Sequence, residues 1–78
     1  MDADELLRRY AAAERDFPDS ELARASLREA NLVSINLSGA NLSNSDLREA
    51  RLGQAKLSQA NLTGANLSET ILWGTNLS

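Results

Sequence analysis

Few side chains in this 78-residue chain could do chemistry, because it contains no histidine and no cysteine. An imidazole base, a thiol nucleophile and a candidate ligand set for zinc are therefore missing. The serines have no base to activate them. The carboxylates of the repeated part are expected at outward positions, where no pocket would shift their pKa. We therefore predict that the chain is not an enzyme and that it binds no cofactor and no metal ion.

Leucine occupies every fifth position from Leu22 to Leu77 without a gap. An α-helix would scatter these leucines around its circumference, since five residues turn it by about 140°. One continuous strand would send alternate leucines to opposite faces. A small residue stands two positions before most leucines, and residues two apart share one face of an extended segment. We therefore predict a short extended piece and a polar turn in every repeat, with four repeats closing a square coil.

The repeats resemble the pentapeptide-repeat family in runs such as Ala60-Asn61-Leu62-Thr63-Gly64 and Ala65-Asn66-Leu67-Ser68-Glu69. The family's pattern is Ala, then Asn or Asp, then Leu, then two polar residues. The resemblance implies a mainly β fold, a right-handed quadrilateral β-helix of about three coils that covers residues 20–78. The departures from the pattern are Ile35 at a small-residue position and Arg51, Lys56 and Ile71 where Asn or Asp is usual.

The segment before the repeats is typical of one amphipathic helix. Its apolar residues recur at steps of four and three, namely Leu6, Tyr10, Ala13 and Phe17. Asp2 or Asp4 can cap its start, and Pro18 disfavours helix at Phe17 and marks its end. We predict that residues 1–19 form an N-terminal capping helix and linker that cover the first coil. A membrane-surface helix and a recruitment element for a partner are the alternatives. The segment also resembles the leader that precedes many cyanobacterial pentapeptide repeats, which implies a cyanobacterial source.

Stacking the repeats four to a coil places the candidate contact residues on two neighbouring faces. One face has a column of arginines beside a column of glutamates, and these columns can neutralise each other. The next face has Trp73 beside Ile71 near the C-terminal end, with Val33 in the tryptophan's column. A tryptophan beside an isoleucine on a polar solenoid is the best candidate for a partner contact. The candidate contact residues are Ile71, Trp73, Val33, Arg28, Arg48, Glu29, Glu49 and Glu69.

The charge distribution separates two hypotheses for function. Some pentapeptide-repeat proteins mimic DNA and protect type II topoisomerases through a long acidic rod, and this remains the alternative reading. Here the net charge of −3 comes from the first nineteen residues, which have three arginines against six acidic side chains. The repeats carry five basic and five acidic side chains. We therefore favour a non-enzymatic module for protein–protein interaction or scaffolding, with a regulatory role among its uses, whose partner protein the sequence does not identify.

The C-terminal end of the repeats is expected to need a cover. The pattern continues to Leu77 and Ser78 with nothing after it to cover the last coil. We expect a second copy, packed end to end as a homodimer through the C-terminal coil, or a partner protein to cover it. No basic stripe with interleaved aromatics indicates direct nucleic-acid binding. No apolar run approaches the ~20 residues that cross a bilayer, so we expect no membrane insertion and a cytoplasmic protein.

Overall fold

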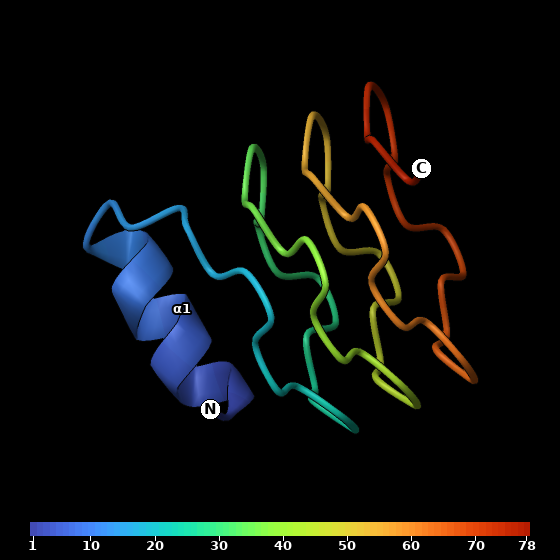
Figure 1. Ribbon diagram of the computed structural model, residues 1–78, viewed down its shortest axis with the longest axis horizontal. Coiled ribbons are helices and arrows are strands. Elements are labelled where there is room, and N and C mark those ends of the chain that lie inside the picture. The colour runs from blue at the N-terminus through green and yellow to red at the C-terminus, as the bar shows by residue number, and fades with distance from the viewer.

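One short helix is followed by a coil of repeated turns in this computed structural model, which describes residues 1–78 (Figure 1). The helix α1 spans Ala3–Ala11. The rest of the chain has no long strand and instead forms an isolated parallel β-bridge at every fifth residue. The architecture is a β-helix type fold with one N-terminal helix, and α1 lies at the end of the stack opposite to the C-terminus (Figure 1). No helix of the chain is long and apolar enough to cross a membrane.

The bridges set the register of the coil. Asp16 pairs with Asn36, Asn36 with Lys56, and Lys56 with Asn76, and three further series begin at Glu21, Ser26 and Asn31. The paired residues are twenty apart, which is the length of four five-residue repeats. We call residues 16–35 the first coil, 36–55 the second and 56–75 the third. Backbone hydrogen bonds join them, as where the Leu27 N–H donates to the Asp46 carbonyl at 2.8 Å.

The five-residue period arises from one recurring turn. In the turn at Leu42, the leucine carbonyl accepts the Ser45 N–H at 3.1 Å, and Asn44 takes the left-handed conformation with a φ of 58°. The side chain of Asn41 accepts the Ser43 N–H at 3.0 Å, which closes the turn from outside. The left-handed residue redirects the chain, and the next small residue and leucine then point inward again. Asn or Asp before the leucine therefore adds a side-chain hydrogen bond to the turn, although the turn after Arg51 closes its backbone bond without it.

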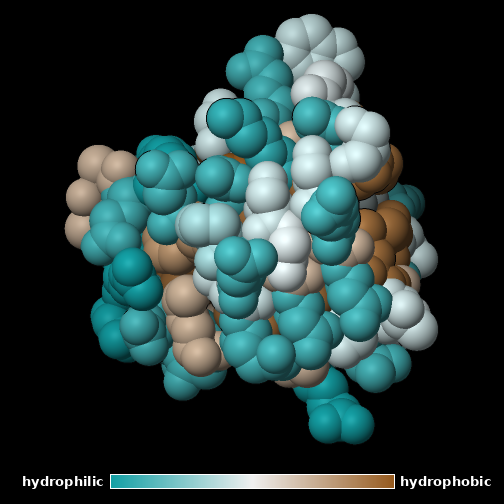
Figure 2. Space-filling view, in the orientation of Figure 1, coloured by the Kyte–Doolittle hydropathy of each residue, from teal (hydrophilic) through white to brown (hydrophobic).

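The leucines form the core, as predicted, from Leu22 to Leu57. Leu47 and its small neighbour Ala50 are both 0% exposed. The last four leucines are less buried, because no further coil covers them in the structure: Leu62, Leu67 and Leu72 are only partly buried and Leu77 is 53% exposed. In Figure 2 the surface is mostly hydrophilic, and brown hydrophobic atoms gather at the right-hand edge, where Figure 1 places the C-terminal coil.

The helix begins as predicted and ends earlier. The side chain of Asp2 accepts the Glu5 N–H at 2.8 Å and caps the first turn. At the other end the Ala13 N–H donates to the Tyr10 carbonyl and the Glu14 N–H to the Arg9 carbonyl, with Ala13 at a φ of 79°. This is a Schellman motif with alanine at the position that usually holds glycine. The prediction of a helix that continues to Phe17 is therefore wrong, because this motif stops it at Ala11.

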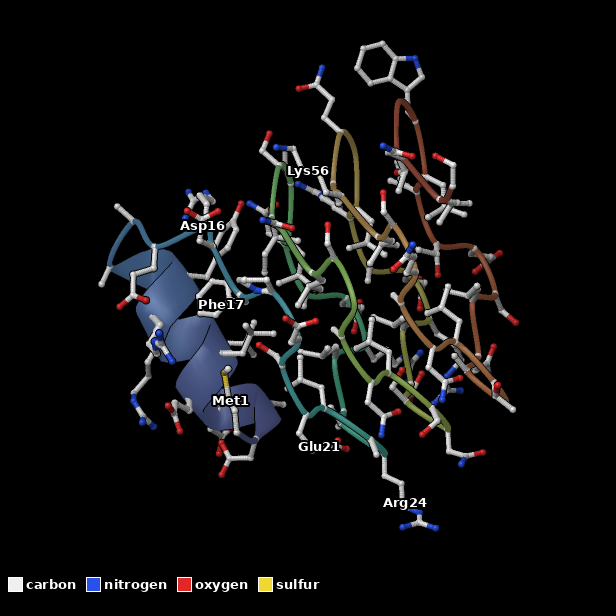
Figure 3. The ribbon with its side chains drawn as sticks, viewed as in Figure 1. Met1, Asp16, Phe17, Glu21, Arg24 and Lys56 are labelled. Carbon is white, nitrogen blue, oxygen red and sulfur yellow. The ribbon has the colours of Figure 1, made fainter.

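Phe17 belongs to the coil and not to the helix. Its N–H donates to the Asn36 carbonyl at 2.8 Å, and its ring is buried. Phe17 therefore takes the place of leucine in a repeat that comes directly before the repeat of Leu22. The ladder therefore starts at Asp16, within the segment predicted as helix and linker. Figure 3 shows Phe17 between α1 and the first coil. Leu6 of α1 is fully buried, and Leu7 and Tyr10 pack against the same core, so α1 covers the N-terminal end of the coil.

Candidate interaction surface

The predicted pairing of the arginine and glutamate columns occurs at one contact between coils. Arg28 Nη2 lies 3.3 Å from Glu49 Oε1, which joins the first and second coils. Glu29 and Glu69 make no ion pair within 4.0 Å. Both partners of the Arg28–Glu49 pair are about half exposed, so solvent screens the attraction and the pair contributes little to stability. This corner is a partly neutralised surface and not a strongly charged patch.

Arg48 pairs with a residue that the sequence did not single out. Its guanidinium lies 2.7 Å from Asp46 Oδ2, and its backbone N–H donates to Asp46 Oδ1 at 3.1 Å. These hydrogen bonds, with the side-chain bond the larger, lower the pKa of the Asp46 carboxyl to about 2. Asp46 therefore has two structural tasks, closing its turn and holding Arg48. Neither Arg48 nor Asp46 is then free to anchor a partner without breaking this pair.

The apolar candidates lie on one side of the coil but not in one cluster. Trp73 is 74% exposed and Ile71 51% exposed, both in the third coil. Val33 is 39% exposed in the first coil, and its carbonyl accepts the Tyr10 hydroxyl at 2.8 Å. Gly53 stands between Val33 and Trp73 in this corner column, which separates the two side chains. The loops of this corner, residues 33–34, 53–54 and 73–74, rise in green, orange-yellow and red at the top of Figure 1.

Two cations border the exposed tryptophan and isoleucine. Arg51 is paired with Ile71 in the ladder, and Lys56 follows Arg51 by one repeat, around the same corner. Both side chains are exposed, and neither forms an ion pair within 4.0 Å. The sequence shows both cations as departures from the repeat. Only the pairing of residues between coils shows that they lie near Ile71 and Trp73. We call Arg51, Lys56, Ile71 and Trp73 together the tryptophan corner.

The remaining features of the surface offer little chemistry. A shallow hollow of about 330 Å³ lies between the first residues of α1 and the first coil, with Asp2, Asp4 and Arg24 among its lining residues. No group of three or more His, Cys, Asp or Glu side chains lies close enough to hold a metal ion. The tryptophan corner is therefore the surface with the clearest chemical character.

Comparison with known sequences identifies the family. The profile of the pentapeptide repeats matches eight copies over residues 20–59 and 45–78. The chain belongs to the pentapeptide repeat family. The matched segments cover the coil up to its last residue, and pentapeptide repeat proteins are in general non-enzymatic modules for protein interaction. No curated protein matches the chain at a significant level.

Two solved pentapeptide repeat proteins from cyanobacteria are similar to this chain. The protein Rfr23 from Cyanothece 51142 is 41% identical with a TM-score of 0.79, over 81% of this chain and 43% of the relative. This chain therefore spans less than half the length of that relative. The protein alr5209 from Nostoc Pcc 7120 is 33% identical with a TM-score of 0.43, over 99% of this chain and 76% of the relative. The similarity to Rfr23 supports the same β-helix type fold.

Proposed function

We propose that this pentapeptide repeat protein is a non-enzymatic module for protein–protein interaction or scaffolding that presents the flat sides of its coil to a partner. The main support is that different residues of each repeat hold the coil and face the solvent. Backbone bonds, leucines and small residues hold the coil, so the outward side chains can vary without changing the backbone. Most of them are small and polar, whereas Trp73 and Ile71 are large, apolar and exposed. Exposed aromatic residues of this kind are enriched at protein interfaces.

The alternative function is mimicry of DNA to protect a type II topoisomerase. The net charge of −3 is its support. Against it, the charges of the repeats balance, and Arg51 and Lys56 place free positive charge on the exposed surface. The longest extent of the molecule is 27 Å, less than one helical turn of duplex DNA at about 34 Å. We therefore rank this function second for the 78-residue chain.

Affinity capture with matched surface variants tests the proposed function. The intact chain and its Trp73→Ser variant are immobilised, and proteins retained from an extract of the source cell are identified by mass spectrometry. The proposal expects a protein that the intact chain retains in stoichiometric amount and that retains the chain in the reciprocal experiment. Retention of gyrase or topoisomerase subunits would favour the alternative. A chain that retains nothing beyond an unrelated folded control would contradict the interaction function.

We also propose the finer description of the fold, a right-handed quadrilateral β-helix of about three coils. The four series of bridges, each offset by five residues, support four sides. The membership of the family supports the right-handed sense. A crystal structure at a resolution that shows the chain direction tests both, and a left-handed coil would contradict the description.

A further inference from the structure

Most turns from residue 36 to the end of the chain share one side-chain hydrogen bond. The residue before each leucine accepts the backbone N–H two positions further on, at 3.0 to 3.1 Å. The six residues that do so between positions 36 and 76 are Asn36, Asn41, Asp46, Asn61, Asn66 and Asn76. Asn and Asp have an acceptor oxygen at the right reach for this bond. The bond is the physical reason for Asn or Asp at this position.

The three remaining residues at this position between residues 36 and 76 do not form this bond. Arg51, Lys56 and Ile71 have no acceptor atom in their side chains. The N–H groups that they leave, on Gly53, Ser58 and Trp73, form no hydrogen bond within the chain. These outward positions have no core to fill, so packing does not account for the exceptions. A local rule that is broken without a structural gain points to a functional site.

The three exceptions surround a single corner. Arg51 lies beside Ile71 in the ladder, and Lys56 lies past the next turn of the second coil. Trp73 occupies the corner between them, where its carbonyl accepts the Gln54 N–H at 2.9 Å. Figure 3 shows Lys56 on the side of the molecule where the corner loops rise, and Arg24 projecting on the opposite side. The broken turns therefore coincide with the tryptophan corner and occur nowhere else in the second and third coils.

The aromatic and charged side chains of the tryptophan corner also have no interaction partner within the chain. The other two aromatic rings each lie under a guanidinium, Phe17 under Arg9 at 5.0 Å and Tyr10 under Arg15 at 3.7 Å. Trp73 has no such neighbour, and its indole N–H has no acceptor within the chain. The two cations beside it have no carboxylate partner. An unengaged tryptophan with an isoleucine and two free cations forms an apolar centre with a positive border.

The charges around the corner narrow the class of partner. Glu49 and Glu69 lie on the preceding corner, and Glu49 is held by Arg28. Arg51 and Lys56 therefore stand near Glu69, which has no ion pair, and this arrangement suits a short anionic segment. A long polyanion such as single-stranded nucleic acid binds instead along a continuous positive groove.

We propose that the tryptophan corner binds an acidic segment of a partner protein, in which an apolar side chain flanked by Asp or Glu packs on Trp73 and Ile71 while the carboxylates pair with Arg51 and Lys56. The proposal rests on the proposed interaction function and names its surface. The chemistry of the partner follows from complementarity of charge and of apolar area.

Selection from a peptide library tests this proposal. Random dodecapeptides displayed on phage are selected against the immobilised full chain, and enriched peptides are synthesised and titrated. Trp73 is the only tryptophan, so its fluorescence reports directly on the corner. We expect enriched peptides with an apolar residue between acidic residues, and a blue shift of the emission when they bind. Enrichment of basic or purely apolar peptides, or no enrichment, would overturn the proposal.

Variants that restore the turn bond give a test that should preserve the fold. Ile71→Asn, Arg51→Asn and Lys56→Asn each install asparagine, the residue that closes five other turns. We expect Ile71→Asn to weaken the selected peptides by about tenfold or more. Arg51→Asn and Lys56→Asn should each weaken binding several-fold, less so at high salt, because they remove a screened attraction. The matched control is Arg24→Asn, an exposed cation on the opposite side, which should leave the affinity unchanged.

The outcomes separate this proposal from the broader function. If peptides bind the Ile71→Asn and Lys56→Asn variants as tightly as the unchanged chain, the tryptophan corner is not the binding site. The interaction function would then belong to another surface. A single-stranded oligothymidylate that binds more tightly than any selected peptide would also overturn it. Failure of the interaction function itself would appear in the affinity capture, where the chain would retain no protein.

Discussion

The two ends of the coil are built from the same repeat, yet they differ in how they are covered. At the N-terminal end, α1 packs over the first coil, and Leu22, Leu27 and Leu32 are buried as deeply as leucines of the second coil. The Tyr10 hydroxyl donates to the Val33 carbonyl, which has no preceding coil to bond. The helix thus supplies apolar cover together with a donor for the exposed backbone.

The C-terminal end has neither kind of cover. The N–H groups of Leu62, Leu67 and Leu72 form no hydrogen bond within the chain, whereas the corresponding groups of the first and second coils are bonded to the next coil. The side chains of these leucines are also only partly buried. A repeat of this kind therefore has no fixed stability of its own, since its burial and its backbone bonds both come from its neighbours.

Removal of α1 is expected to have the largest effect. Deleting residues 1–13 would uncover the leucines and carbonyls of the first coil and make the N-terminal end like the other. We expect circular dichroism to lose the helical signal and light scattering to show aggregation or end-to-end association. A folded, monomeric remainder would instead fit a helix that serves only to recruit a partner, and would contradict the capping role.

Leucine truncation in one column should give the next largest effect and show the difference between coils directly. Leu47→Ala in the second coil should cost about 2–5 kcal/mol of unfolding free energy, because the site is fully enclosed. Leu67→Ala, one coil further, should cost roughly 1–2 kcal/mol, since its side chain is already partly exposed. Thermal and urea melts measure both, with Arg48→Ala as the surface control that should cost under about 1 kcal/mol. Equal losses of unfolding free energy at the two leucines would mean that the third coil encloses its leucine as well as the second coil does.

Two hydroxyls at equivalent inward positions provide a smaller contrast. Thr70 in the third coil donates to the Leu47 carbonyl at 2.6 Å, whereas the buried Ser45 hydroxyl has no partner. Thr70→Ala should therefore destabilise the chain by about 1 kcal/mol. Ser45→Ala should be neutral or stabilising by up to about 1 kcal/mol, because it removes an unsatisfied polar group. A loss of stability in Ser45→Ala comparable with that of Thr70→Ala would mean that Ser45 has a hydrogen-bond partner in solution.

A substitution at the end of α1 should produce the smallest change, in the stabilising direction. Ala13 adopts a left-handed conformation that glycine takes without strain. Ala13→Gly should raise the unfolding free energy by about 0.5–1 kcal/mol, although the greater freedom of glycine in the unfolded chain offsets part of the gain. Urea melts would measure this gain, and Ala12→Gly, at the preceding position with ordinary φ, is the control that should destabilise. A destabilised Ala13→Gly variant would mean that the helix does not end in this motif.

The sequence predicts the period of the coil and its core because each repeat satisfies its turn and its inward positions locally. It does not locate the end of the helix, because Phe17 fits two patterns at once. Phe17 lies at helical spacing from Tyr10 and Ala13, and it also lies five residues before Leu22. Only the bonds around Ala13 decide between them, and alanine there gives no indication of the left-handed conformation that glycine would indicate.

The candidate surface is predictable in part. Ile71 and Trp73 follow from the outward positions, and the structure exposes both. The sequence treats Arg51 and Lys56 as departures from the pattern and not as part of a site, since the meaning of a departure depends on the hydrogen bond that the usual Asn makes. Arg48 is placed on the surface as predicted, but its partner Asp46 lies in the same turn and not in the glutamate column.

Amide hydrogen exchange at single-residue resolution tests the difference between the two ends most directly. Leu27, Leu47 and Leu67 occupy one column, and their N–H groups differ only in whether a next coil accepts them. In dilute solution we predict strong protection of the Leu27 and Leu47 amides and rapid exchange of the Leu67 amide. Protection of Leu67 that grows with protein concentration would indicate the predicted end-to-end pairing of two copies. Equal protection of all three amides in dilute, monomeric protein would contradict the account.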